Sequence, residues 1–168
     1  MLSTRLLEEI NLQIKYELES AHYYNAMQAY FDSNDLLGFA NFFKVQAQEE
    51  RSHAEKFYHF VYETNGDVSL TALDLPGKDF DSPLDVFKKA LVHEQFVTKR
   101  IYHLMDIAVE EKNYATQSML NWFIDEQVEE ENSMREIIVM LERVQDNPNG
   151  LYMLDAKLAG RTFTPPVA

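Results

Sequence analysis

The placement of proline and glycine constrains this chain more than any other feature of its sequence. The five glycines and five prolines fall at positions 38, 66, 76, 77, 83, 148, 150, 160, 165 and 166. Since both residues disfavour helix interiors, the long stretches between them are free to form helices. Within those stretches apolar residues recur at alternating steps of three and four, which is the period of an amphipathic helix. The sequence therefore predicts an all-α protein.

Polar residues mark the ends of the first two predicted helices. We expect one helix over about residues 3–32 and a second over about residues 36–63. Asp35 is the expected N-cap of the second helix, because its carboxylate can accept hydrogen bonds from free backbone amides. That helix should end before Asn65 and Gly66, which adopt the left-handed conformation of a helix C-terminus more easily than other residues.

The second half of the chain repeats this arrangement and adds a short helix. A third helix should begin after Ser82, whose hydroxyl can cap it, and should end near residues 111–113. A fourth helix is expected over about residues 114–145, a short fifth over about residues 151–159, and a tail over residues 161–168.

The lengths of the connections predict the topology. The first and second helices are joined by a few residues, as are the third and fourth, so each pair forms an antiparallel hairpin. The connection over residues 66–82 can run back along the bundle if it is extended. We therefore expect a single domain over residues 1–168, an antiparallel four-helix bundle over about residues 3–145 with one long crossover, plus the short C-terminal fifth helix.

Each long helix carries a carboxylate near the middle of its apolar stripe. In the third helix, Glu94 interrupts a row of apolar residues that runs from Phe87 to Ala108. Antiparallel packing brings the midpoints of the helices to one level, where unpaired carboxylates would cost several kcal/mol of desolvation. Oxygen ligands with one imidazole suit two iron or manganese ions. The inward polar residues are Glu17, Glu50, His53, Glu94, Gln127 and Glu130.

Composition excludes several other classes of protein. The absence of cysteine excludes disulfides, thiolate metal sites and cysteine nucleophiles. A net charge of −13 argues against a nucleic-acid partner, because phosphate contacts need a basic face. We also expect no membrane partner and a cytoplasmic location, because the sequence shows neither a long apolar run nor a signal peptide.

These residues resemble the ferroxidase centre of the bacterial and archaeal non-haem ferritins. The motifs QEERSH at residues 48–53 and DEQVEEE at residues 125–131 carry the likeness, which extends from Leu6 to about Leu158. The resemblance implies two iron ions, with Glu50 bridging them. The implied ligands are Glu17, Glu50 and His53 for the first iron and Glu50, Glu94 and Glu130 for the second.

The resemblance assigns roles to further residues around the pair. Gln127 and Tyr24 would hydrogen-bond around the bound oxygen species, while Glu49, Glu126 and Glu129 match the ligands of a third iron site. Gln127 stands where a symmetric di-iron protein has a second histidine, which weakens one iron site and fits iron that passes through to a mineral. Bacterioferritins bind haem through a methionine that is replaced here by Arg51, so no haem is expected.

The implied function is iron storage with ferroxidase activity. Dioxygen or hydrogen peroxide would oxidise Fe(II), and the ferric product would collect inside a hollow homo-oligomeric cage of about 24 subunits. Tyr23, Tyr30 and Phe31 are expected to be exposed on a lone bundle and to be buried at subunit contacts.

Three alternatives stay open from the sequence. A di-iron or di-manganese oxidase or peroxidase would use the same ligands but would need an apolar substrate pocket. A DNA-protecting mini-ferritin conflicts with the net charge of −13, and a purely structural bundle leaves Glu94 unexplained.

The remaining candidate residues carry weaker signals. His93 lacks the second histidine of a zinc-protease motif, so we do not count it as a ligand. Trp122 is expected to serve packing. The histidines off the inward stripes are expected at the surface or at an interface, and they are His22, His59 and His103.

Overall fold

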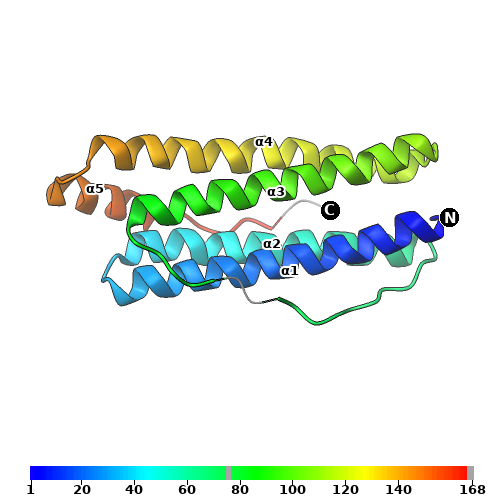
Figure 1. Cartoon of the computed structure of the whole chain (residues 1–168), viewed down its shortest axis with the longest axis horizontal. Helices are drawn as coiled ribbons and strands as arrows, with labels where there is room; N and C mark the ends of the chain where they lie inside the picture. Colours follow the sequence, from blue (N-terminus) through cyan, green and yellow to red (C-terminus); the bar gives the residue numbers. More distant parts are fainter. Residues whose placement is uncertain (75–76, 166–168) are drawn as a thin grey trace.

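A computed structural model describes residues 1–74 and 77–165, and this part of the chain forms five helices and no strand (Figure 1). Four long helices lie side by side, with the short fifth helix at one end of the bundle. α1 packs mainly against α2, and α3 mainly against α4, which confirms the predicted hairpins. No described helix is long and apolar enough to cross a membrane. The helices are α1 (Thr4–Ser33), α2 (Leu37–Glu63), α3 (Pro83–Glu110), α4 (Tyr114–Arg143) and α5 (Pro148–Leu158).

The predicted long crossover joins α2 to α3 and runs back along α1 (Figure 1). Asn11 of α1 holds it at two points, donating to the Asp67 carbonyl at 3.1 Å and accepting from the Ser69 amide at 2.8 Å. Farther along, Lys15 donates to Asp74 at 3.0 Å. Parts of the expected crossover (residues 75 and 76) and of the expected tail (166–168) lie outside the described residues.

The long helices end on residues in the left-handed conformation, and none of these is a glycine. Asp35 follows α1 with φ of 57°, and the Leu36 amide donates back to the Phe31 carbonyl at 3.1 Å. The prediction that Asp35 caps α2 was therefore wrong, because this residue completes the C-terminus of α1. The other residues in this conformation are Asn65, Lys112 and Asp146.

The N-terminus of α2 is capped from the far end of the chain. Its own N-cap position, Leu36, offers no side-chain hydrogen bond. Asp155 of α5 supplies it instead, because its Oδ1 accepts from the amides of Gly38 at 2.8 Å and Phe39 at 2.9 Å. A Cβ on Gly38 would lie 1.7 Å from the Asp155 carbonyl oxygen, so only glycine permits this approach of α5 to α2.

α5 itself begins earlier than expected, at Pro148, because Asn147 caps it.

Two apolar clusters make up the core, one toward each end of the bundle. The cluster that includes the α5 end is rich in phenylalanine, with Phe31, Phe39, Phe43 and Phe87 in mutual contact, and we call it the aromatic cluster. We call the other, with Leu6, Ile10, Ile101, Leu104 and Leu120 among its members, the aliphatic cluster.

The expectation of exposed aromatic residues on α1 was wrong for one of the three. Phe31 is fully buried in the aromatic cluster. Tyr23 and Tyr30 are half-buried, and both contact Phe80 of the crossover, with ring centroids 6.2 Å and 5.6 Å away. The crossover thus covers part of the surface that the sequence alone assigns to a subunit contact.

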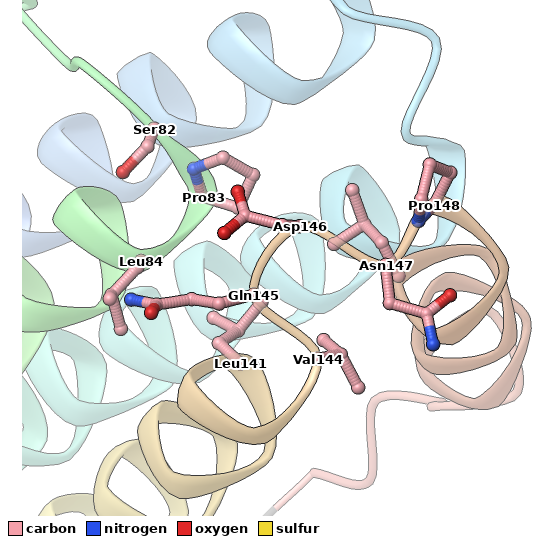
Figure 2. A pocket seen from close by; sticks show the side chains of 10 residues that line it. Ser82, Pro83, Leu84, Leu141, Val144, Gln145, Asp146, Asn147 and Pro148 are labelled. Atoms are coloured by element: carbon pink, nitrogen blue, oxygen red, sulfur yellow. The ribbon is translucent and has the colours of Figure 1, made fainter.

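A surface pocket of about 580 Å³ lies where α3 begins, α4 ends and α5 begins (Figure 2). Ser82 and Leu84 lie on one side of this pocket, and Leu141 and Val144 on the other. Asp146 is the only acidic residue among its described lining residues, so the pocket offers no group of carboxylate ligands.

Candidate metal centre

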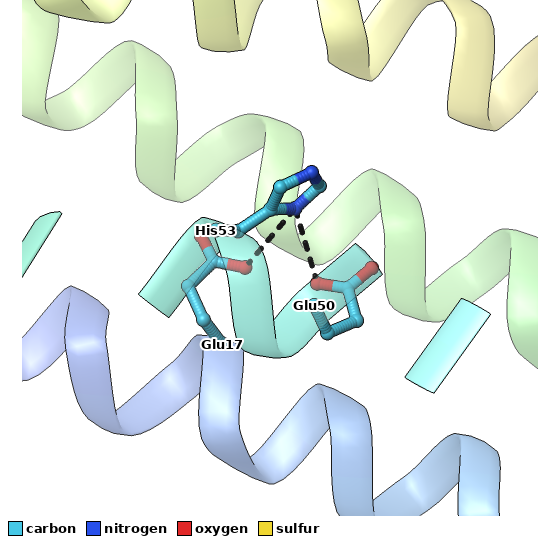
Figure 3. A group of neighbouring side chains, drawn as sticks. All are labelled: Glu17, Glu50 and His53. Atoms are coloured by element: carbon cyan, nitrogen blue, oxygen red, sulfur yellow. Dashed lines mark ion pairs between the residues drawn. The ribbon is translucent and has the colours of Figure 1, made fainter. Parts of the chain in front are cut away.

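Three buried side chains from α1 and α2 lie close enough to share a metal ion. One ligand atom from each of Glu17, Glu50 and His53 lies within 4.8 Å of the others. His53 Nδ1 is 3.5 Å from a Glu50 oxygen and 3.9 Å from Glu17 Oε2, and Figure 3 shows the three groups converging. All three side chains are at most 3% exposed. The resemblance to the non-haem ferritins implied these three as the ligands of one iron.

Helix periodicity explains this convergence. Glu50 and His53 are three residues apart on α2, so their side chains project from the same face of that helix, one turn apart. Glu17 meets them from α1 because the two helices pack closely along their length. The fourth residue of this neighbourhood is Gln13, one turn before Glu17, whose amide donates to Glu17 Oε1 at 2.8 Å.

Glu94 of α3 and Glu130 of α4 are also buried, at the same position along the bundle as the three residues above. Hydrogen bonds hold the carboxylates of both residues. Glu94 accepts from the Tyr24 hydroxyl and, at 3.1 Å, from the amide of Gln127. Glu130 accepts from the amide of Gln46 at 2.8 Å. The compact group of ligand atoms comprises Glu17, Glu50 and His53, while Glu94 and Glu130 face it from the other helix pair. We call these five residues together with Gln46 and Gln127 the polar layer.

Burial makes the charged forms of these carboxyl groups costly. It raises the pKa of Glu94 to about 7 and, with the charge of Glu94, the pKa of Glu130 to about 8. The pKa of Glu50 lies well above its usual value, because of burial and then because of the charges of Glu94, Glu17 and Glu130. Glu50 therefore lies within electrostatic reach of every other carboxylate in the layer.

An unsatisfied oxygen tests whether these residues fit a metal. Glu17 Oε2 is buried and has no hydrogen-bond partner, although its other oxygen accepts from Gln13. A buried carboxylate oxygen without a donor is unfavourable, and a cation between Glu17, Glu50 and His53 would satisfy it. Carboxylate oxygens with a single imidazole form a donor set that suits iron or manganese. The residues therefore fit the implied metal.

The three glutamates predicted for a third iron site lie farther out. Glu49 and Glu126 are half-buried and line a pocket of about 280 Å³ that reaches His53, whereas Glu129 is exposed. Burial raises the pKa values of both Glu49 and Glu126. Glu49 is also paired with Arg161, whose guanidinium lies 2.7 Å away. The structure thus brings two of the three predicted ligands to one pocket, whereas Glu129 is not among the residues that line it.

Gln13 and Gln46 belong to the site, although neither was among the predicted site residues. Both are fully buried, and each donates to a carboxylate of the polar layer. Gln46 lies on the inward stripe of α2, so the period of three and four could have identified it. Gln13 could have been found from its position one turn before Glu17, because residues four apart on a helix contact each other.

The remaining histidines lie away from the ligand group. His93 contacts the Ser20 hydroxyl at 2.7 Å, and burial lowers its pKa to about 4, so it is neutral. Trp122 packs edge-on against Phe123, as expected, and also against His53. The histidines found exposed, as predicted, are His22, His59 and His103.

Comparison with known proteins gives a consistent result. Residues 7–144 match the family model described as a ferritin-like domain. The chain is 47% identical over 163 residues to a bacterial non-heme ferritin of Staphylococcus aureus, covering 97% of this chain and 98% of the relative. The corresponding protein of Staphylococcus saprophyticus is 44% identical with the same coverage.

Solved structures resemble the chain equally well. An open-pore ferritin from the hyperthermophilic archaeon Archaeoglobus fulgidus superposes with a TM-score of 0.95 at 42% identity, covering 96% of this chain and 100% of that one. A closed form of the same archaeal ferritin, engineered by site-directed mutagenesis, gives 0.96 at 43% identity and covers 98% and 100%.

Proposed function

The chain belongs to the ferritin family, and from this premise we propose how its own residues bind Fe(II) for oxidation by dioxygen or hydrogen peroxide and prepare the iron for storage. Family membership makes the protein an iron-storage protein with ferroxidase activity. The finer proposal is that oxidation takes place in the polar layer. The observation that carries it is the buried group of Glu17, Glu50 and His53, in which one carboxylate oxygen has no partner.

We assign two Fe(II) ions to the layer as substrates. Glu17, Glu50 and His53 would hold the first ion, and Glu50 would share the second with Glu94 and Glu130. The position of Glu50 supports this assignment, because the charges of the other three glutamates all act on it. Bound Fe(II) supplies the electrons, and dioxygen or hydrogen peroxide accepts them.

The protein residues move protons and orient ligands. Because burial raises the pKa values of Glu94 and Glu130 to about 7 and 8, these carboxyl groups carry protons near neutral pH before iron binds. Iron binding expels those protons, since a carboxylate must be ionised to act as a strong ligand. Tyr24 and Gln127 position Glu94 through hydrogen bonds to its two oxygens.

The same proposal covers the third site, the assembly and the location. Glu49, Glu126 and Glu129 would hold a third iron at the pocket beside His53. No haem is expected, because Arg51 replaces the haem-ligating methionine.

The subunits would close into a homo-oligomeric cage of 24 copies, as the family resemblance implies. We propose a cytoplasmic location, where Fe(II) is kept reduced.

The alternative of a di-iron or di-manganese oxidase is less favoured. An organic substrate would need an apolar pocket next to the metals. The pocket that reaches His53 has Trp122 and Pro165 in its wall, but its lining also includes four polar residues, Glu49, Glu126, Ser52 and Thr164. Such a lining suits hydrated cations better than an apolar substrate.

The first experiment measures iron bound per subunit after stepwise aerobic addition of Fe(II), on particles separated by size exclusion. We expect uptake far beyond three ions per subunit on a very large particle. Saturation at two or three ions on a small oligomer would mean that the metal is a resident cofactor, and storage would be rejected.

A variant tests the assignment of the layer. Glu94→Ala should slow Fe(II) oxidation on the order of 100-fold, because the second ion loses a ligand and a shared negative charge. The helical circular dichroism spectrum should not change. Glu55→Ala removes the same group from an exposed position on α2 and serves as the control. Equal oxidation rates in both variants would contradict the assignment.

A further inference from the structure

The chain after α5 turns back along α2 (Figure 1), and Asn41 of α2 holds the start of this stretch. The Asn41 side-chain amide donates to the carbonyls of Leu158 at 3.2 Å, Ala159 at 3.3 Å and Arg161 at 2.9 Å. Three backbone groups held by one side chain give this stretch a defined path. We call residues 159–165 the C-terminal segment.

Arg161 points from this segment toward the third-site glutamates. One guanidinium nitrogen donates to Glu49 Oε2 at 2.7 Å, and another donates to the Phe42 carbonyl at 3.4 Å. The guanidinium carbon lies 4.2 Å from the centroid of the Phe42 ring. Both charged side chains are largely shielded from solvent, at 24% exposed for Arg161 and 21% for Glu49. The contacts on three sides indicate a built position rather than a loose surface pair.

The end of the same segment forms a wall of the pocket beside the metal centre. Thr164 and Pro165 line this pocket opposite residues of α2 and α4, among them His53, Trp122 and Glu126. The segment therefore places a fixed cation on Glu49 and closes one side of the space in which a third ion would sit.

We propose that Arg161 is an internal competitor for the third iron ion, so that the C-terminal segment sets how tightly that ion binds. The proposal rests on the proposed third site. Arg161 keeps its charge at every physiological pH, since guanidinium does not lose its proton. A metal ion on Glu49 must therefore either displace Arg161 or bind beside another positive charge. Both options weaken binding.

The chemistry of the pair explains how Arg161 would be displaced. Glu49 has two oxygens, and Arg161 occupies one of them, so an arriving ion can bind the free oxygen before the ion pair opens. Phe42 then retains the guanidinium through its carbonyl and ring face. Arg161 thus returns to Glu49 once the ion leaves, and the third site favours passage over permanent occupancy.

The test uses Tb³⁺ as a probe of carboxylate sites, added to the assembled full-length protein after two equivalents of Zn²⁺. Trp122 is the only tryptophan in the sequence and lines the pocket, so it sensitises Tb³⁺ emission from there. Glu49→Gln identifies the part of the signal that belongs to the third site. Arg161→Gln keeps a polar side chain and removes the charge, and Arg161→Lys keeps the charge.

We expect Arg161→Gln to bind Tb³⁺ at a concentration on the order of 5- to 10-fold lower than the parent protein. Arg161→Lys should stay within about twofold of the parent, because it retains the competing charge. Arg5→Gln removes an equal charge from the exposed pair with Glu110 and should change nothing.

Each other outcome has a definite meaning. If Arg161→Gln binds Tb³⁺ as the parent does, or more weakly, competition by Arg161 is wrong although the third site stands. If Arg161→Gln and Arg161→Lys both tighten binding equally, loosening of the segment explains the effect, and charge competition is rejected. If Glu49→Gln leaves the emission unchanged, the third site of the proposed function fails, and the competition fails with it.

Discussion

In the aromatic cluster the large side chains find apolar partners, whereas the polar layer beside it buries carboxyl groups with raised pKa values. Phe43 and Phe87 lie with ring centroids 4.9 Å apart, and neither is exposed. At the same depth in the bundle, Glu17 retains an oxygen without a partner. Burial stabilises the first region whatever the pH or the metal content. It stabilises the second only when protons or metal ions neutralise the charge.

The aromatic cluster and the polar layer thus have different tasks in the molecule. The two apolar clusters hold the helices in place at both ends, and the layer between them can then keep groups that are unfavourable by themselves. Stability and metal binding should therefore respond to different substitutions. Three measurements test this separation.

The largest effect is expected in the aromatic cluster. Phe87→Ala should lower the free energy of unfolding by about 3–5 kcal/mol, because it leaves a cavity among four phenylalanine rings. Urea denaturation of the metal-free protein measures the loss. The control is Phe96→Ala, since Phe96 is 40% exposed, and it should cost much less. A loss below about 1 kcal/mol for Phe87→Ala would contradict the role of this cluster.

The next effect is a pH dependence that arises in the polar layer. Burial raises the pKa values of Glu94 and Glu130 to about 7 and 8, above their value of 4.5 in the unfolded chain. The folded state therefore binds more protons than the unfolded state between these values, so stability falls as pH rises. We expect the free energy of unfolding of the metal-free protein to fall on the order of 2–4 kcal/mol from pH 6 to pH 8.

Two additions sharpen this measurement. Zn²⁺ should remove most of the fall by neutralising the layer, and Glu130→Gln should reduce it by removing one titrating group. If the free energy of unfolding of the metal-free protein stays level or rises over this range, the charged carboxylates of the polar layer are buried without cost. That result would contradict the difference between the polar layer and the aromatic cluster.

The smallest effect is expected at the junction of α2 and α5. Asp155→Ala should cost about 1–2 kcal/mol, since two amides at the start of α2 lose their acceptor. Asp155→Asn retains an oxygen and should cost less. Neither variant should change the number of Zn²⁺ ions bound per subunit in calorimetric titration. A loss of bound ions would show that the end of the bundle and the polar layer are not separate.

The sequence predicted the fold and the side chains that the structure brings together in the polar layer, because their signals are local and periodic. Glu50 and His53 are one turn apart, and the interruption of an apolar stripe at Glu94 is visible without any structure. The cap at Ser82 was equally accessible, because its hydroxyl accepts from the Asp85 amide three residues later at 3.1 Å. Such features depend on neighbours within a turn of helix.

Features that depend on distant residues could not be predicted in this way. Asp155 caps a helix 117 residues earlier in the chain, and no local pattern announces it. Asp35 has the right side chain for a cap, but the left-handed backbone at the end of α1 takes precedence. The contact of Arg161 with Glu49 depends on how the C-terminal segment turns, and the sequence predicted only a tail there.

The cap that Asp155 provides also determines the order in which parts of the chain can fold. A ribosome releases α1 and α2 well before residues 148–158 have been made, so the nascent hairpin leaves the exit tunnel with the first amides of α2 exposed to water. Closing this contact requires pairing across more than a hundred residues, which is slow compared with local helix formation. The start of α2 is thus among the last parts of the subunit to become ordered, and a nascent chain that stalls before α5 keeps that end frayed.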